Sequence, residues 1–177
     1  RRNIDITTIV MNNNIYGMTS GQYSPMTPKG FLGTTAPYGN VERPFDLGKL
    51  AIASGASFVG RSTAYHVQLL GELIEKALLN KGFSVVEAVT QCPTYLGRKN
   101  KLGSAVDMLK WLKDGAVNVK AAAAMAPDKL EGKFLIGELH SESAPEFTAE
   151  YCALANGVRR KFDDFQGGDR GCEQNSD

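Results

Sequence analysis

The sequence predicts an α/β fold: a doubly wound, mostly parallel sheet with helices on both faces. Residues 4–11 and 83–89 are apolar, rich in β-branched side chains and short enough to be buried strands. Residues 63–79 and 103–112 instead repeat apolar side chains with a helical period. Strands that alternate with helices favour parallel pairing, because each helix carries the chain back to the same end of the sheet.

The first strand is followed by a long segment, residues 16–43, that is dense in Gly, Pro, Ser and Thr. A loop of this length in a compact domain is usually functional or disordered. Its few apolar side chains cannot offset the entropy of fixing it, so we expect it to be poorly ordered unless a cofactor or partner holds it. Asp46 can then cap a short helix that runs to Ser54.

The rest of the chain continues the alternation. Gly82 stands where it can end a helix, and Pro145 stands near the start of another, where its missing N–H costs little. The expected elements are a strand at residues 58–60, a helix at 63–79, a strand at 83–89, a helix at 103–112, a strand at 134–139 and a helix at 145–156.

The composition is that of an ordinary globular domain. The 177 residues are 42% hydrophobic and 22% charged, and the net charge of +1 gives no general attraction to nucleic acid or membranes. No apolar run reaches the roughly 20 residues of a membrane span. Three cysteines are an odd number, which argues against a disulfide framework and fits a reducing cytoplasm. We interpret residues 1–165 as one domain and the polar residues 166–177 as a disordered tail.

The most informative segment is residues 10–25, at the end of the first strand. It reads Val-Met-Asn-Asn-Asn-Ile-Tyr-Gly-Met-Thr-Ser-Gly-Gln-Tyr-Ser-Pro. Amide, hydroxyl and carbonyl oxygens in one turn are the hard ligands that Mg²⁺ takes beside a phosphate, and α/β folds bind phosphates where a strand breaks into such a loop. The triplet Asn12, Asn13 and Asn14, taken without its neighbours, favours an ordinary turn.

With its neighbours, the segment resembles the second half of the thiamine diphosphate motif, in which an apolar strand ends in Asn-Asn. It is most similar to the β subunit of the 2-oxoacid:ferredoxin oxidoreductases, especially the 2-oxoglutarate type. The resemblance implies that Mg²⁺ is bound by the Asn13 side chain and the Ile15 backbone carbonyl. It also implies contacts to the cofactor from Tyr16, Gly17, Met18 and Thr19, and contacts to the substrate from Met18 and Ser20.

A second block, residues 87–100, supports the same family. It resembles the segment that carries a cysteine ligand of the family's [4Fe-4S] cluster, so Cys92 is implied as one of four ligands. A free cysteine can also be a small buried apolar residue. Cys152 and Cys172 are more consistent with structural or incidental roles.

Two parts of the family pattern are missing from this sequence. No Gly-Asp-Gly triplet occurs, and the family's other cluster cysteines lie further toward the N-terminus. We therefore expect the C-terminal part of a longer subunit, lacking the leading strand of the domain, the Mg²⁺ carboxylate and three cluster ligands. Ser20 and Met26 also depart from the family, which commonly has Gly or Lys and Thr there.

The resemblance implies an enzyme that oxidatively decarboxylates 2-oxoglutarate to succinyl-CoA, with electrons passing to ferredoxin. Its cofactors would be thiamine diphosphate, Mg²⁺ and a [4Fe-4S] cluster, and its partners an α subunit, ferredoxin, the 2-oxoacid and coenzyme A. No catalytic side chain is assigned, because the activating carboxylate belongs to the α subunit in this family. Two alternatives stay open: a pyruvate or broad 2-oxoacid enzyme, and a non-catalytic scaffold fragment.

Because ligands gather at the carboxyl edge of open α/β sheets, one geometric expectation follows. The strands at residues 4–11 and 83–89 should be central neighbours, with Asn13 and Cys92 both beyond their carboxyl ends.

Overall fold

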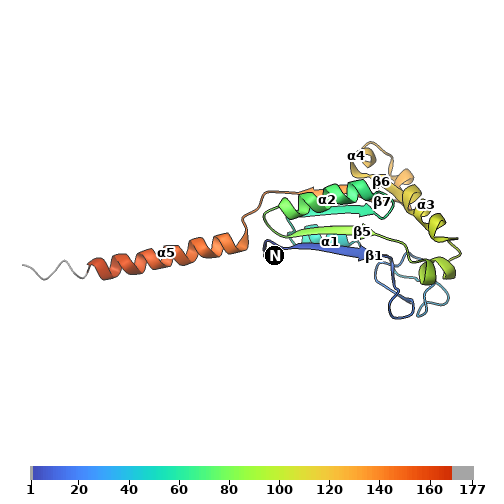
Figure 1. Ribbon diagram of the computed structural model, residues 1–177, viewed down its shortest axis with the longest axis horizontal. Coiled ribbons are helices and arrows are strands. Elements are labelled where there is room, and N and C mark those ends of the chain that lie inside the picture. Colours follow the sequence, from blue (N-terminus) through green and yellow to red (C-terminus); the bar gives the residue numbers. More distant parts are fainter. Residues whose placement is uncertain (1, 169–177) are drawn as a thin grey trace, which may run out of the picture.

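A computed structural model describes residues 2–168. It contains an α/β domain built on one five-stranded sheet, from which a long helix projects (Figure 1). The strand order is β1-β5-β4-β7-β6. These strands are β1 (Thr7–Asn12), β5 (Ser84–Val89), β4 (Phe58–Thr63), β7 (Phe134–Ser141) and β6 (Ala116–Asn118). All neighbouring pairs are parallel except β4 and β7, so the expected mostly parallel α/β sheet is confirmed.

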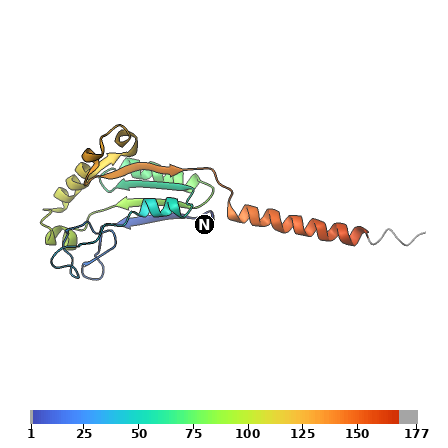
Figure 2. The same ribbon diagram turned by 180° about the vertical axis from the view of Figure 1, so that it is seen from behind.

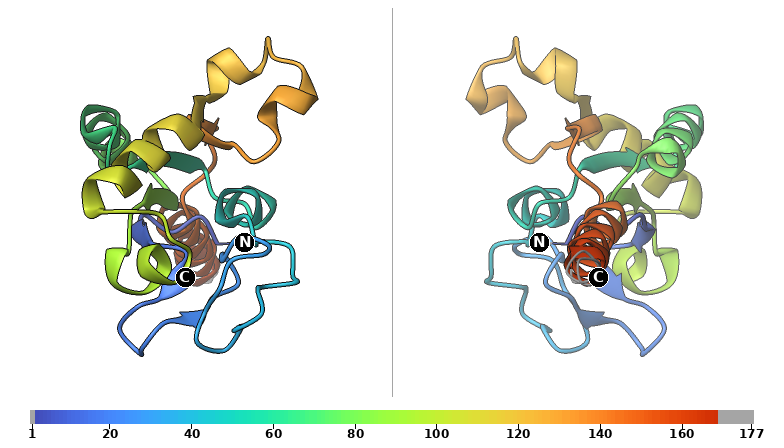
Figure 3. Two further views of the ribbon diagram at one scale, coloured as in Figure 1. Left: turned by 90° about the vertical axis from the view of Figure 1, so that its right-hand side faces the viewer. Right: turned by 90° about the vertical axis from the view of Figure 1, so that its left-hand side faces the viewer.

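Helices cover both faces of the sheet, as the end-on views in Figure 3 show. Helix α1 (Leu47–Ala53) packs on one face and α2 (Val67–Leu79) on the other. Successive strand residues point to opposite faces, so Phe58 of β4 contacts the α2 side while Val59 contacts the α1 side. The sheet is thus a buried layer whose position is fixed from both sides.

The start of each helix follows from local hydrogen bonds. The Asp46 carboxylate accepts from the Lys49 amide at 3.1 Å, which confirms the predicted cap of α1. Helix α2 begins at Val67 and not at residue 63, because Thr63 is the last residue of β4 and its hydroxyl accepts from the His66 amide. Helix α3 (Ala105–Gly115) begins with a capping box between Ser104 and Asp107.

Several short elements were not expected from the sequence. They join the larger elements at the edges of the domain. They are β2 (Ile15–Tyr16), β3 (Gln22–Tyr23), η1 (Pro93–Gly97), β6, α4 (Val119–Ala122) and η2 (Pro127–Leu130).

Two expectations about elements were wrong. Strand β1 is not central: among the described residues it pairs with β5 alone and forms an edge, with Met11 67% exposed. The final helix does not end at residue 156. Helix α5 (Phe147–Gly168) continues because its apolar side chains keep a helical spacing past Asn156. Its last residues fall in the expected tail, of which residues 169–177 lie outside the described part of the chain.

The long loop after β1 folds back on itself. Its strands β2 and β3 form a small hairpin. The buried Thr27 hydroxyl accepts from the Ser24 amide at 2.8 Å and donates to the Asn14 carbonyl, and the buried Asn40 amide donates to the Thr27 carbonyl at 2.8 Å. The expectation that this loop is poorly ordered without a bound cofactor stays a prediction.

Helix α5 leaves the domain from the sheet edge opposite to this loop (Figures 1 and 2). Because β7 runs antiparallel to β4, it delivers the chain to the amino ends of β1 and β5. There the Phe147 amide donates to the Asn3 carbonyl at 2.9 Å. The helix therefore starts far from the carboxyl edge of the parallel strands.

Candidate functional site

The loops after β1 and β5 begin side by side. Asn12 pairs with Val89 in the parallel ladder, and the Thr90 amide donates to the Asn12 carbonyl at 2.7 Å. Beyond them, a Cβ placed on Gly17 would lie 3.4 Å from both Asn13 Nδ2 and Cys92 Sγ. The expectation that Asn13 and Cys92 lie at the same edge of the sheet is confirmed.

The three asparagines form two successive side-chain turns. Asn12 Oδ1 accepts from the Asn14 amide at 2.9 Å, and Asn13 Oδ1 accepts from the Ile15 amide at 3.1 Å. Asn14 has a φ of 60°, a left-handed conformation that Asn tolerates better than most residues. The turn that the triplet favours is therefore present. It leaves Asn13 Oδ1 with a second lone pair that could bind a cation.

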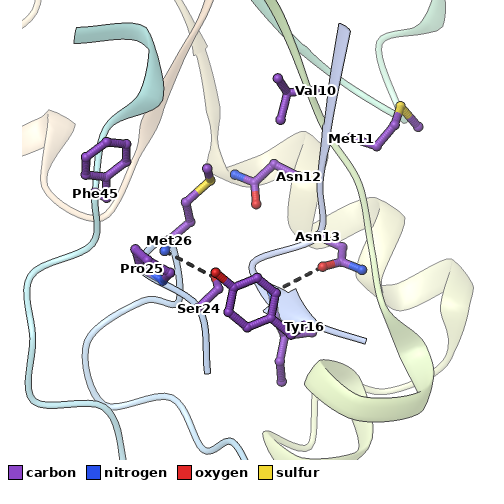
Figure 4. Close-up of a pocket in the computed structure, with 10 residues that line it drawn as sticks. Val10, Met11, Asn12, Asn13, Tyr16, Ser24, Pro25, Met26 and Phe45 are labelled. Carbon is purple, nitrogen blue, oxygen red and sulfur yellow. Dashed lines mark hydrogen bonds between the residues drawn. The ribbon is translucent and has the colours of Figure 1, made fainter. Parts of the chain in front are cut away.

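A cavity of about 340 Å³ lies against this turn (Figure 4). Apolar side chains make most of its wall, and the amides of Asn12 and Asn13 add polar groups. Such a mixture is typical of small-molecule sites. The lining residues are Val10, Met11, Asn12, Asn13, Ile15, Tyr16, Ser24, Pro25, Met26 and Phe45.

The structure brings only some of the predicted site residues to this cavity. Asn13, Ile15 and Tyr16 line it. The side chain of Met18 is fully exposed, and the Thr19 hydroxyl donates to Gln22 within the hairpin. The following residue, Ser20, is exposed with a φ of 82°. The cofactor and substrate roles implied for Gly17, Met18, Thr19 and Ser20 stay predictions.

Cys92 is half-buried at the start of η1. It packs against a buried cluster of Ile15, Leu96 and Met108. Among residues 2–168, no three His, Cys, Asp or Glu side chains are grouped so that they could hold a metal ion. Cys152 lies on α5 and is exposed. The described residues can therefore offer a cluster at most one thiolate at this edge.

A buried ionic network next to the cavity was missed by sequence reasoning. Glu87 accepts from Asn12 Nδ2 at 2.7 Å and from Arg61 Nε at 2.6 Å, while Arg61 Nη2 donates to Asp46 at 2.6 Å. Glu87 is 4% exposed and Arg61 8%. The available signal was a single charge within each of two buried strands, since such charges need a partner.

This network borders a second cavity of about 710 Å³, which shares Asn12, Met26 and Phe45 with the first. Burial raises the pKa of the Asp46 carboxyl, but hydrogen bonds from the Lys49 amide and from Arg61, with the charge of Arg61, outweigh it and the net pKa is lowered. Burial lowers the pKa of Arg61, but Glu87 and Asp46 raise it further, so the guanidinium stays charged. Asp46 and Arg61 are therefore both charged at neutral pH.

A polar turn and a cavity at the carboxyl edge of a doubly wound sheet define a cofactor-binding α/β domain. The family described as thiamine pyrophosphate enzyme, C-terminal TPP binding domain, matches residues 1–88. No helix within residues 2–168 is both long and apolar enough to span a membrane.

The chain is 49% identical over 156 residues to 2-oxoglutarate synthase subunit KorB of Methanothermobacter thermautotrophicus, a match that covers 88% of this chain and 54% of that protein. It is 54% identical over 160 residues to the subunit of the same name from Archaeoglobus fulgidus, covering 90% and 57%. The chain thus spans about half the length of the curated relatives it matches.

A solved 2-oxoglutarate:ferredoxin oxidoreductase from Magnetococcus marinus has a similar fold, with a TM-score of 0.75 and 26% identity over 89% of this chain and 54% of that one. Residues 1–88 thus form a thiamine pyrophosphate enzyme C-terminal domain, and most of the chain is similar to subunits of 2-oxoglutarate synthases.

Proposed function

We propose that this chain is part of an enzyme that converts 2-oxoglutarate and coenzyme A to succinyl-CoA and CO₂ and passes an electron pair to ferredoxin. The observation that carries the proposal is the Asn13–Ile15 turn, which lies against a cavity at the carboxyl edge of the sheet. The choice of substrate is supported by the relatives named 2-oxoglutarate synthase and by the Magnetococcus enzyme, described with 2-oxoglutarate, coenzyme A and succinyl-CoA bound.

The donor atoms of the turn fit a Mg²⁺ ion in part. Asn13 Oδ1 accepts from the Ile15 amide, and the Ile15 carbonyl accepts from the Gly17 amide. Each oxygen keeps a second lone pair. Two oxygens on one turn can therefore bind a cation without breaking the turn. Mg²⁺ requires about six oxygens, and the others would come from the diphosphate, water and a carboxylate outside the described residues.

The cavity fits the apolar part of a cofactor held by that ion. Thiamine diphosphate supplies the electron sink that allows a 2-oxoacid to lose CO₂. In our proposal, Asn13 and Ile15 fix the metal and Tyr16 and Gly17 border the cofactor. Thr19 offers its hydroxyl to the diphosphate, and Met18 and Ser20 face the substrate.

Electron transfer would use Cys92 as one ligand of a [4Fe-4S] cluster. Its sulfur lies beside Gly17, next to the proposed metal turn, which would put the cluster near the source of electrons. Three further thiolates must come from outside the described residues. We infer an α subunit as the partner that completes the active site, ferredoxin as the acceptor, and the reducing cytoplasm as the location.

A broader substrate range is a second candidate. The chain is also 43% identical over 95 residues to a 2-oxoacid:ferredoxin oxidoreductase subunit beta of Saccharolobus solfataricus, a match that covers 54% of this chain and 31% of that protein. Rates with 2-oxoglutarate, pyruvate and 2-oxobutyrate, measured on the assembled enzyme, separate the two candidates.

Asn13→Ala in the full-length, assembled enzyme tests the proposed role of the turn. It removes one metal oxygen, so we expect weaker binding of Mg²⁺–thiamine diphosphate and little ferredoxin reduction with 2-oxoglutarate, partly restored by excess cofactor. Asn118→Ala is a matched control, because Asn118 makes the same type of turn by accepting from the Lys120 amide, but lies at the β6 edge. If Asn13→Ala has unchanged cofactor affinity in a titration, the assignment fails.

A further inference from the structure

We propose that Glu87 is a positioning residue for the cofactor turn, and that it acts through Asn12. This inference rests on the proposed function of the turn and concerns how its ligand atoms are oriented. Glu87 lies two residues before the carboxyl end of β5 and lines the larger cavity, but not the smaller one. Its effect on the metal ligands must therefore be indirect.

The first step is the fixed position of the Glu87 carboxylate. The carboxylate is 4% exposed and accepts from Arg61 Nε at 2.6 Å. Arg61 is itself held on its other side by Asp46, the cap of α1. The two oxygens of this carboxylate each accept from a neighbouring side chain, Arg61 on one side and Asn12 on the other.

The second step is the orientation of the Asn12 amide. Because Glu87 can only accept, it selects the Nδ2 side of Asn12, with which it forms a hydrogen bond of 2.7 Å. The Oδ1 atom must then point toward the turn, where it accepts from the Asn14 amide at 2.9 Å. The flipped amide would bring two donors together at Asn14 and two acceptors together at Glu87.

The third step joins Asn12 to the metal ligands. The hydrogen bond from Asn14 helps to hold this residue at a φ of 60°. That left-handed residue turns the chain so that the Ile15 amide reaches Asn13 Oδ1 at 3.1 Å. The directions of Asn13 Oδ1 and of the Ile15 carbonyl thus depend on a carboxylate on the neighbouring strand.

A buried ion pair is a weak source of stability, since desolvation can offset its Coulomb energy, but it can specify one geometry. The network around Glu87 has the features of a buried ion pair that specifies one geometry. Each of its charges has a partner, and it ends on an amide whose orientation matters. Groups that orient metal ligands from one layer further out commonly change metal affinity by about 10-fold to 100-fold when they are removed.

The test exchanges the donor and acceptor between positions 12 and 87 in the full-length, assembled enzyme. Glu87→Gln should raise the Mg²⁺ concentration for half-saturation, at saturating thiamine diphosphate, by about 10-fold or more. Asn12→Asp should do the same, because it sets two carboxylates against each other. The double variant N12D/E87Q should return toward the wild-type value. In it, the amide introduced at position 87 can donate through its nitrogen to the new carboxylate at position 12 and accept from Arg61 through its oxygen.

A purely structural role would lower only the thermal midpoint of unfolding. The thermal midpoint and the Mg²⁺ concentration for half-saturation are therefore both measured for each variant. Leu73→Ala, in the core under α2, is the control that lowers the thermal midpoint without raising the Mg²⁺ requirement. Should Glu87→Gln fail to fold, Asn12→Ala gives the same test and leaves the Glu87–Arg61 ion pair in place. It should raise the Mg²⁺ requirement as well.

The outcomes distinguish this inference from the proposed function. If the wild-type enzyme binds no Mg²⁺–thiamine diphosphate, the proposed function itself fails. If the wild-type enzyme binds it and the single variants have the same Mg²⁺ requirement, the positioning role is overturned. Single variants that are impaired to the same degree as N12D/E87Q would also overturn it.

Discussion

At the scale of single residues, Gly21 is held by both its conformation and its neighbour. Its φ is 87°, and an added Cβ would lie 2.7 Å from Cδ1 of Tyr95, which packs against the cluster of Ile15, Leu96 and Met108. Gly30 has a similar φ of 84° but has nothing within 4 Å of the same position. The ring of Tyr95 in η1 therefore lies so close to the hairpin that no side chain fits at position 21.

This pair gives a controlled prediction. Gly21→Ala and Gly30→Ala each place an alanine in a left-handed conformation, which should lower the free energy of unfolding by about 1–2 kcal/mol. Only Gly21→Ala also displaces Tyr95, so its free energy of unfolding should fall by a further 1–3 kcal/mol, roughly the cost of overpacking. Urea denaturation of the two variants measures the difference. Equal losses would mean that Tyr95 moves aside freely.

Asp46 makes stability depend on acid pH. Its pKa is lowered in the folded protein, although burial opposes this, because the Lys49 amide and Arg61 bind the carboxylate. A lowered pKa contributes stability that is present above the unfolded value, about 3.9, and is lost as pH falls through the folded value. Asp46→Asn should therefore flatten the loss of stability below about pH 4.

Unfolding curves between neutral and strongly acid pH measure this contribution. Glu75→Gln, which removes an exposed carboxylate from α2, is the control. It should leave the slope of the free energy of unfolding against pH nearly unchanged. A slope for Asp46→Asn equal to that of the wild type would show that the cap does not couple folding to protonation.

Local signals identified some site residues and not others. The cap at Asp46 and the turn at Asn12–Asn14 depend on residues close in sequence, so the sequence predicted both. The partnership of Asn12 with Glu87 depends on how β1 and β5 pair, across a separation of 75 residues. No pattern near either residue contains that information, although the lone charges of Arg61 in β4 and Glu87 in β5 each need a partner when buried.

At the scale of elements, α2 shows how one helix divides between core and solvent. Leu73 is 2% exposed and packs against Phe58 and Val86, whereas Leu79 in the last turn is 73% exposed. Leu73→Ala should cost about 2–5 kcal/mol, and Leu79→Ala about 0.5 kcal/mol or less. Thermal or urea unfolding of both variants checks the contrast. Similar losses would mean that the outer side of α2 is covered by another surface.

The boundaries of elements were predicted less well than their existence. Periodicity located α2 and α3, but hydrogen bonds to the hydroxyls of Thr63 and Ser104 precede the first residues of these helices, Val67 and Ala105. The last helix was expected to end at Asn156, but the apolar spacing continues beyond it. The helix follows the spacing and leaves Leu154, Val158 and Phe162 more than half exposed.

At the scale of the whole molecule, the described residues would form only part of the proposed catalytic site. In our proposal they supply two oxygens for a metal and one thiolate for a cluster, and residues 2–168 contain no group of three His, Cys, Asp or Glu side chains that could hold a metal ion. We predict that the 177-residue chain, isolated from other polypeptides, has no 2-oxoglutarate-dependent activity and no intact cluster.

Anaerobic reconstitution with iron and sulfide tests this, followed by 2-oxoglutarate, coenzyme A, thiamine diphosphate, Mg²⁺ and a viologen dye. The full-length enzyme with its partner subunit is the positive control. A brown isolated chain that reduces the dye would contradict the prediction.

The alternation of strands and helices was sufficient to predict the fold class, because parallel pairing follows from crossover connections. The position of β1 at an edge and the antiparallel β7 could not be predicted this way. Strand order is decided by which apolar faces cover one another across the sheet, and that is a property of the assembled layers.

The hydrogen bond between Asn12 and Glu87 also has a consequence for synthesis of the protein. During translation, Asn12 is made 75 residues before Glu87, a delay of roughly 4 to 15 s at ordinary elongation rates. Throughout that interval the nascent turn lacks the carboxylate that orients its amide and the strand that completes its ladder. If this turn holds the cofactor as proposed, tight cofactor binding waits until β5 has left the ribosome and paired with β1. A nascent chain stalled before residue 87 should therefore retain thiamine diphosphate more weakly than one stalled after β5 has emerged.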